Sequence, residues 1–299
     1  MINPLVSIIV ATYRREDVLW NALSSLSSQS YSNIEVVLVD DNDDLQWNTR
    51  VRDVVERFGE KYPSVRFQYI VNHPNRGSAE TRNIGISVAN GDYITFLDDD
   101  DVYLPDKVKQ QVAFMEQKQL DYSITDLYLY NENGKLVDKR TRGYLTTANE
   151  HKLFECHMKY HITGTDAMMF RKDYIVKIGG FPPIDVGDEF HLMQRAIEHE
   201  GKFGYLPVCD IMAYVHTGEG GLSSGQGKIN GENALYEHKK QFFKDFDKKS
   251  VRYIKTRHHA VLAFAYLRDK KCVKFLREVI LSVAVDPICS IKMFWDFVS

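Results

Sequence analysis

The sequence lacks the features that mark membrane, secreted and zinc-finger proteins. No run approaches 18 consecutive apolar residues, so we expect no membrane-spanning helix. The N-terminus has no basic segment followed by an apolar core, so we expect no signal peptide. The four cysteines lie far apart without a CxxC pair, which argues against a zinc site or a disulfide framework. Together these absences predict a cytoplasmic protein with reduced thiols.

The chain has little net charge, but that charge is unevenly distributed. Its formal net charge is −3 at pH 7. Residues 237–299 contain 14 Lys/Arg and 7 Asp/Glu, whereas the first 236 residues contain 24 and 34. A basic segment after an acidic body indicates an anionic partner for that segment. A solvated helix face is the plain alternative.

Strand and helix patterns alternate along the first 130 residues. Short apolar, β-branched runs predict buried strands, and apolar residues at three- and four-residue spacing predict helices. The expected strands are 6–12, 34–39, 65–71, 93–97 and 121–130. The expected helices are 17–28, 49–62, 78–89 and 104–118. This alternation predicts a parallel α/β sheet with its ligand at the carboxyl ends of the strands.

The pattern changes after residue 135. Shorter pieces predict strands at 164–171 and 210–215 and a helix at 188–200. Residues 217–228 hold five glycines and predict a loop. From residue 231 onward the pattern is helical.

Two acidic clusters follow two of the predicted strands. Asp40-Asp41 closes the second strand, and the run Asp98-Asp99-Asp100-Asp101 closes the fourth. Strand ends of a doubly wound sheet share one crevice, so we expect both clusters to face it. Adjacent carboxylates repel one another, and a bound Mg²⁺ or Mn²⁺ removes that cost. A solvated acidic turn is the alternative.

Five segments, in order, resemble family 2 glycosyltransferases of the GT-A fold. They are SIIVATYRRED from Ser7, VVLVDDND from Val36, NRGSAETRNIG from Asn75, YITFLDDDDVYLPDK from Tyr93 and GDEFHLMQRAI from Gly187. The resemblance covers about residues 4–225. It implies a Rossmann-like nucleotide-binding sheet flanked by helices, with a smaller mixed sheet on the acceptor side. It also implies a catalytic domain over 1–230 and a helical C-terminal extension over 231–299.

The resemblance assigns the nucleotide to the first three strand ends. Thr12 and Tyr13 would border the base, and Asp41 would bind it, in the family typically a uracil. The sequence reads DDND where the family usually has DDGS, which keeps the carboxylate and changes the turn. Arg76 and Arg82 would lie near the base and the diphosphate.

The family's DxD motif falls on Asp98 and Asp100. By the family pattern Asp100 ligates the Mn²⁺ or Mg²⁺ that bridges the diphosphate, and Asp98 or Asp99 faces the ribose. Four consecutive aspartates leave the register open by one position. His216, before the glycine-rich loop, would complete the metal or phosphate site, although a lone histidine is as often structural.

An inverting transfer needs a carboxylate that takes the proton of the acceptor hydroxyl. The family supplies it from a Glu-Asp pair at the start of a helix. Here the order is inverted to Asp188-Glu189, so Glu189 aligns with the base and Asp188 stays a candidate. Acidic residues also stabilise a helix N-terminus, which is the structural alternative.

The resemblance therefore implies a hexosyl- or N-acetylhexosaminyltransferase. It would move a sugar from a nucleotide-diphosphate donor, expected to be UDP-linked, to a glycan or lipid-linked acceptor in surface polysaccharide or glycoconjugate synthesis. A catalytically silent nucleotide-sugar binder and a receiver-type signalling domain are the alternatives. A nucleotidyltransferase is disfavoured because ATYRR, after the first strand, contains no glycine.

The C-terminal segment has an amphipathic pattern of its own. Leu276, Val279, Ile280 and Val283 share one helical face, and basic residues flank it. Ile291, Phe294, Trp295 and Phe297 follow further along. This pattern indicates peripheral membrane contact, docking on the catalytic domain or homodimerisation. We expect no nucleic-acid partner.

Overall fold

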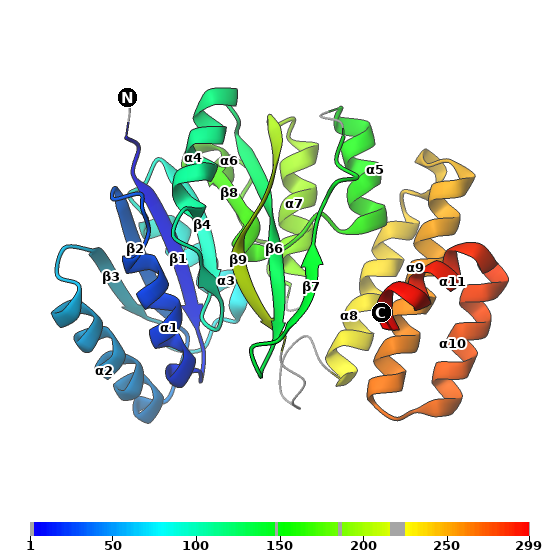
Figure 1. The fold of residues 1–299 in the computed structure, drawn as a ribbon, viewed down its shortest axis with the longest axis horizontal. Helices are drawn as coiled ribbons and strands as arrows, with labels where there is room; N and C mark the ends of the chain where they lie inside the picture. Colours follow the sequence, from blue (N-terminus) through cyan, green and yellow to red (C-terminus); the bar gives the residue numbers. More distant parts are fainter. Residues whose placement is uncertain (1–2, 147–148, 185–186, 216–224, 299) are drawn as a thin grey trace. The chain divides into compact units, whose positions relative to one another are not determined.

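The computed structural model describes residues 3–146, 149–184, 187–215 and 225–298 (Figure 1). The chain forms two compact units, residues 1–153 with 162–216, and residues 154–161 with 217–299. The domain limits expected from the sequence, 1–230 and 231–299, stay predictions.

The first unit is built on four parallel strands in the order β3-β2-β1-β4. Their bounds are Val6–Thr12 for β1, Ile34–Asp40 for β2, Arg66–Val71 for β3 and Tyr93–Asp98 for β4. β1 and β2 are buried on both faces, as their continuous apolar runs predict. The register pairs Thr12 with Asp40 and Ala11 with Asp98. Both acidic clusters therefore begin at the same edge of the sheet.

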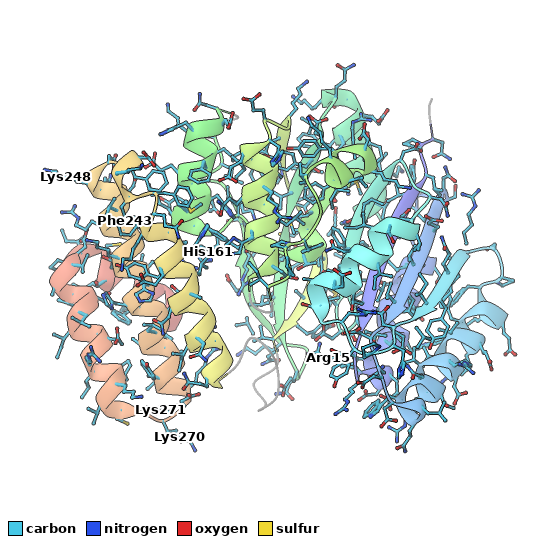
Figure 2. The ribbon with its side chains drawn as sticks, turned by 180° about the vertical axis from the view of Figure 1, so that it is seen from behind. Arg15, His161, Phe243, Lys248, Lys270 and Lys271 are labelled. Carbon is cyan, nitrogen blue, oxygen red and sulfur yellow. The ribbon has the colours of Figure 1, made fainter. Side chains whose placement is uncertain are left out.

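Helices cover both faces of these parallel strands. α1 (Glu16–Ser27) and α2 (Leu45–Lys61) pack together, and α3 (Ser78–Val88) packs on β1 and β2. α1 lies in front of the strands in Figure 1, and α3 is in front in the reversed view of Figure 2. The three- and four-residue apolar spacing of α1 places Leu19, Leu23 and Leu26 in the core.

Beyond β4, four antiparallel pairings and one parallel pairing, between the sixth and ninth strands, extend the sheet to nine strands within the described residues. The added strands are β5 (Val102–Tyr103), β6 (Tyr122–Asn131), β7 (Leu136–Arg140), β8 (Met168–Arg171) and β9 (Phe203–Val215). The helices of this part are α4 (Lys107–Lys118), α6 (Lys172–Lys177) and α7 (Asp188–Glu198). α5 (Glu150–Tyr160) begins in the first unit, and its residues from 154 onward belong to the second. The predicted α/β class is confirmed, and the smaller mixed sheet is continuous with the parallel one.

The second unit is helical from residue 225. The helical pattern expected from residue 231 is present, but residues 225–228, expected in a loop, belong to the first of these helices. Its helices are α8 (Gly225–Lys240), α9 (Lys248–Arg268), α10 (Cys272–Val285) and α11 (Pro287–Val298). Among the described residues, none of the helices combines the length and apolarity that crossing a bilayer requires. Ile229 of α8 and Leu262 and Ala265 of α9 form a small apolar core.

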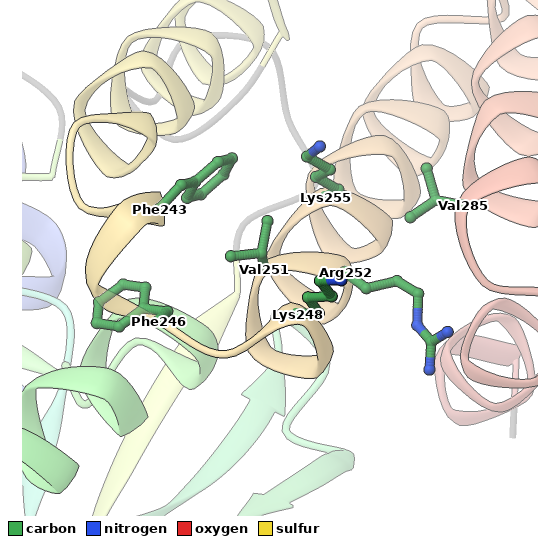
Figure 3. A pocket seen from close by; sticks show the side chains of 7 residues that line it. All are labelled: Phe243, Phe246, Lys248, Val251, Arg252, Lys255 and Val285. Atoms are coloured by element: carbon green, nitrogen blue, oxygen red, sulfur yellow. The ribbon is translucent and has the colours of Figure 1, made fainter.

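A pocket of about 450 Å³ opens within this second unit (Figure 3). Lys248, Arg252 and Lys255 of α9 line it, together with Phe243, Phe246, Val251 and Val285. The Nε of Arg252 also lies 2.9 Å from the carboxylate of Asp286, at the end of α10. The pocket wall is therefore cationic and apolar.

Candidate active site

Asp41 organises the loop that leads into α3. Its Oδ1 accepts hydrogen bonds from the backbone N–H of Arg76 at 2.8 Å and the side-chain amide of Asn72 at 2.9 Å. Its Oδ2 accepts from the backbone N–H of Gly77 at 2.9 Å. Gly77 has φ = +79°, a conformation that suits glycine, directly before the first residue of α3. The buried carboxylate thus fixes the loop, and a contact with a nucleotide base stays a prediction.

Asp40 has a structural environment. Its oxygens accept hydrogen bonds from the backbone and side chain of Asn42, from Asn48 and from the hydroxyl of Tyr69. A fully buried carboxylate needs such donors, because an unpaired buried charge is costly.

The four aspartates after β4 diverge to different partners. Asp99 accepts a hydrogen bond of 2.7 Å from Thr12 Oγ1 at the end of β1. Arg15, between β1 and α1, contacts Asp99 and Asp100 and is labelled in Figure 2. Burial, followed by the charge of Asp100, raises the pKa of Asp99 to about 7. Asp98 and Asp101 turn toward other side chains.

Asp98 and Asp101 converge with Asp166 on one point. A carboxylate oxygen of each lies within 4.8 Å of the others. Asp166 precedes β8 and accepts the backbone N–H of Asp98 at 2.8 Å. Burial and the charge of Asp98 raise the pKa of Asp166 to about 7, and burial with Asp166 raises the pKa of Asp101. Three carboxylates held together at this cost fit a hard divalent cation such as Mn²⁺ or Mg²⁺.

A network of buried hydrogen bonds lies next to this carboxylate cluster. Lys107 of α4 donates to Thr95 Oγ1 at 2.7 Å and to the Tyr103 hydroxyl at 2.8 Å. The Tyr103 hydroxyl also lies 3.0 Å from the backbone carbonyl of Asp166. Burial lowers the pKa of Lys107 to about 7. The network ties α4, β4 and the Asp166 turn into one frame.

Arg82 of α3 joins the carboxylate run to the start of α7. Its Nη2 lies 2.8 Å from Asp98 Oδ1, and its Nη1 lies 2.9 Å from Asp188 Oδ2. Burial opposes the charge of Arg82, but Asp98 and Asp188 outweigh it and raise its pKa. The planar guanidinium can serve two carboxylates at once, which an ammonium group does less well.

Asp188 and Glu189 begin α7. Gly187 precedes them with φ = +85°, which turns the chain into the helix. Asp188 Oδ1 accepts the backbone N–H of Glu189 at 2.9 Å, so Asp188 also satisfies a donor of the first helical turn. Burial, together with a hydrogen bond to Asp188 and its charge, raises the pKa of Glu189 to about 8. Glu189 therefore keeps its proton to a higher pH than an ordinary carboxyl group does.

Several predicted site residues come together in the structure. Thr12, Arg82, Asp98, Asp99 and Asp188 are linked by the contacts above.

Other predicted residues have different surroundings. Asp100 contacts Arg15, and its role as a metal ligand stays a prediction. Tyr13 is exposed, with Arg14 over its ring, and the exposed Arg76 contributes its backbone N–H to Asp41. His216 lies outside the described residues.

Arg15 and Asp166 were not anticipated from the sequence. Asp166 lies 68 residues from Asp98 and meets it only because β8 pairs antiparallel with β4. The one available signal was a charged residue directly before an apolar strand in GTDAMMF. Arg15 lies within the segment ATYRRED, next to residues already assigned to the nucleotide.

Comparison with known proteins identifies a family. The profile described as Glycosyl transferase family 2 matches residues 7–179. The uncharacterized glycosyltransferase MJ1057 of Methanocaldococcus jannaschii is 26% identical over 208 residues, 69% of each chain. WfaP of Escherichia coli, named a UDP-Glc:alpha-D-GlcNAc-diphosphoundecaprenol beta-1,3-glucosyltransferase, is 34% identical over 126 residues. That match covers 42% of this chain and 47% of WfaP, about half its length.

Solved structures share the fold at low sequence identity. TarS 1–349 of S. aureus in complex with UDP-GlcNAc matches with a TM-score of 0.60 and 16% identity, over 94% of this chain and 91% of that one. The mannosyltransferase PcManGT of Pyrobaculum calidifontis, with GDP-Man and Mn²⁺, matches with a TM-score of 0.58 and 18% identity, over 94% and 75%. Because the family profile covers more than half of the 299 residues, the chain belongs to glycosyl transferase family 2 and is a glycosyltransferase with the GT-A fold.

Proposed function

We propose that the chain transfers a hexosyl or N-acetylhexosaminyl group from a nucleotide-diphosphate sugar to a hydroxyl, with inversion at the anomeric carbon. The observation that carries this proposal is the Arg82 bridge between Asp98 and Asp188. It brings the carboxylate cluster of Asp98, Asp101 and Asp166 together with the start of α7, where the pKa of Glu189 is raised. Family membership sets aside the receiver-type alternative.

In the proposed mechanism the carboxylate cluster and the start of α7 have different tasks. The first deals with the negative charge on the leaving group, and the second with the proton of the acceptor. Asp98, Asp101 and Asp166 would hold the divalent cation, which as a Lewis acid neutralises charge on the leaving diphosphate. The acceptor oxygen forms a bond to the anomeric carbon while the bond from that carbon to the phosphate oxygen breaks. Glu189, as a carboxylate, takes the proton of the acceptor hydroxyl, and the nucleoside diphosphate leaves.

Asp188 would position this base. It accepts from Arg82 and from the backbone N–H of Glu189, so its own carboxylate is fixed on both sides. Its negative charge helps to keep the pKa of Glu189 near 8, where a carboxylate is a stronger base than in water. Asp188 as the base itself is the alternative that the paired carboxyls leave open.

The donor and acceptor classes are proposed from the relatives. TarS is described with UDP-GlcNAc and PcManGT with GDP-Man and Mn²⁺. The name of WfaP specifies a lipid-diphosphate acceptor, and TuaG of Bacillus subtilis is named a putative teichuronic acid biosynthesis glycosyltransferase. We infer a uridine-linked donor and a glycan or lipid-linked acceptor in surface polysaccharide synthesis.

The proposal is tested by thermal unfolding against a panel of UDP- and GDP-sugars with Mn²⁺, because a ligand that binds the native state raises its stability. The stabilising donor is then incubated with candidate acceptors, and the anomeric configuration of the product is measured by NMR. Stabilisation with release of nucleoside diphosphate and an inverted linkage is expected. Binding with no turnover would support the silent sugar-nucleotide binder instead, and a retained configuration would overturn the inverting mechanism.

A further inference from the structure

Helix α10 packs polar side chains against the protein. Glu278 and Ser282 are buried, and Glu278 lies 2.7 Å from His259 of α9. Ser282 Oγ pairs with Ser290 Oγ of α11 at 2.8 Å and lies 3.3 Å from the carbonyl oxygen of Thr256 in α9. An ordinary surface helix buries its apolar stripe and exposes its polar one. α10 instead buries two polar side chains and leaves several apolar ones exposed.

The apolar side of α10 and α11 is exposed instead. Val273, at the start of α10, is 83% exposed, and Ile280 in its middle is 67% exposed. Leu276 and Val283 complete a ridge at three- and four-residue spacing, which is the spacing of one helical face. On α11, Ile288 is 83% and Trp295 73% exposed, with Ile291 between them. We call these seven side chains the apolar ridge.

Three residues predicted for this face behave differently. Val279 is half-buried, and the ring of Phe294 packs against Phe264 of α9 at 5.4 Å between centroids. The side chain of Phe297 lies outside the described residues. The helices of the second unit therefore pack through other side chains, and the seven side chains of the apolar ridge remain exposed to solvent.

Cationic side chains flank the ridge. Lys274 and Arg277 follow Val273 and Leu276 along α10, and Lys292 follows Ile291 on α11. Lys270 and Lys271 lie at the turn between α9 and α10, as Figure 2 shows, and Lys271 pairs with Asp269. Lys274, Arg277 and Lys292 are exposed.

Two carboxylates close to the ridge, among the side chains that the structure describes, are paired within the second unit. Glu278 is bound by His259, and Asp286 is bound by Arg252. The charge presented beside the apolar ridge is therefore positive.

We propose that the apolar ridge docks on an anionic membrane surface, with α10 and α11 lying in the plane of the interface. The positive charge beside the ridge favours an anionic membrane over a second copy of the chain. A second copy of the chain would bring one set of lysines and arginines against another, whereas anionic headgroups attract them. Trp295 suits the same position, because tryptophan is enriched at the boundary between headgroups and acyl chains. The proposal rests on the second unit alone and is independent of the sugar donor and the chemistry.

The test is flotation of the full chain with vesicles of phosphatidylcholine and with vesicles of equimolar phosphatidylcholine and phosphatidylglycerol. The chain should float with the anionic vesicles, and salt should weaken that binding. Ile280→Ser/Ile291→Ser should lower the partition coefficient at least about tenfold, since each loses apolar burial. Lys274→Gln/Arg277→Gln should lower it by about fivefold per residue on the anionic vesicles. The exposed positions make all four substitutions compatible with the fold.

A matched control tests whether the effect of removing positive charge depends on its position beside the apolar ridge. Lys109→Gln/Lys118→Gln removes two exposed charges from α4, outside the ridge, and should leave flotation unchanged. The emission of the wild-type chain should shift to the blue on anionic vesicles, and Trp295→Phe should remove that shift. Equal binding to both vesicles, no binding to either, or a dimer in sedimentation that Ile280→Ser/Ile291→Ser converts to a monomer would each overturn the membrane assignment.

Discussion

Nη1 of Arg82 lies 2.9 Å from Oδ2 of Asp188, although 106 residues separate them in the sequence. The same guanidinium reaches Asp98, so a single buried cation balances two carboxylates from different parts of the site. Removing the cation would leave the Asp188 carboxylate, whose side chain is only 7% exposed, without its guanidinium partner, and an unpaired buried charge is costly. The position of α7 relative to β4 therefore depends on this side chain.

Arg82→Gln should lower the free energy of unfolding by about 3 kcal/mol, because it breaks a buried ion pair from one side. Arg82→Lys should recover only part of this, since an ammonium group cannot bridge two carboxylates in the same geometry. Urea denaturation measures both. The control is Arg50→Gln, which removes an exposed partner of Glu16 and should cost less than about 1 kcal/mol. A cost for Arg82→Gln as small as that of the control would contradict the bridge.

Asp166→Asn should weaken Mn²⁺ binding at least about tenfold, because it removes one of three converging oxygen ligands. Calorimetric titration with Mn²⁺ measures the loss. Asp100→Asn is the informative comparison, since the family motif assigns a ligand to that position and the structure places it beside Arg15. Comparable losses of Mn²⁺ affinity in the two variants would indicate that both Asp166 and Asp100 bind the metal. Unchanged binding in Asp166→Asn would remove the carboxylate cluster as the metal site.

Local patterns were sufficient for the parallel half of the sheet. The apolar runs at Val6–Thr12 and Ile34–Asp40 have the length and composition of buried strands, and the acidic residues after them had to meet at one edge. β9 was harder. It runs from Phe203 to Val215 with register shifts against β6, and only its last part has a strand-like pattern.

The site was predictable where its residues follow a strand or begin a helix. Asp98 and Asp188 satisfy that condition, and both were assigned from the sequence. Asp166 and its support by Tyr103 depend on antiparallel pairing between distant segments, which no local spacing encodes. The raised pKa of Glu189 likewise depends on burial and on Asp188, so its identity was predictable from the family motif and its pKa was not.

The raised pKa of Glu189 predicts how the stability of the fold changes with pH. In the folded chain it lies near 8, above the ordinary carboxyl value of 4.5, so folding takes up a proton between these two pH values. Stability should therefore fall as the pH rises from about 5 to 8 in the absence of metal. Asp99 and Asp166, whose pKa values are also raised, contribute to the same loss. Glu189→Gln should remove the part that comes from Glu189 and exceed the wild type at pH 8 by at least about 1.4 kcal/mol, the equivalent of one pKa unit.

Denaturation in EDTA at pH 5 and pH 8 measures this difference. Glu198→Gln removes an exposed carboxylate from the same helix and serves as the control. A Glu189→Gln variant that is no more stable than the wild type at pH 8 would show that the carboxyl group ionises normally.

The base assignment gives the last prediction. Glu189→Gln keeps the shape of the side chain and its place in the first turn of α7, but it cannot accept the acceptor's proton. It should lower kcat at least about 10²-fold, the usual scale for a general base, with donor affinity nearly unchanged in calorimetry. Asp188→Asn should cost less in kcat, because the amide side chain still offers an oxygen to the backbone N–H of Glu189 or to Arg82. It should also lower the pH at which activity reaches half its maximum, since the charge that helps to raise the pKa of Glu189 is gone. A larger loss in Asp188→Asn than in Glu189→Gln would make Asp188 the base, and two small losses would reduce the pair to a helix start stabilised by Arg82.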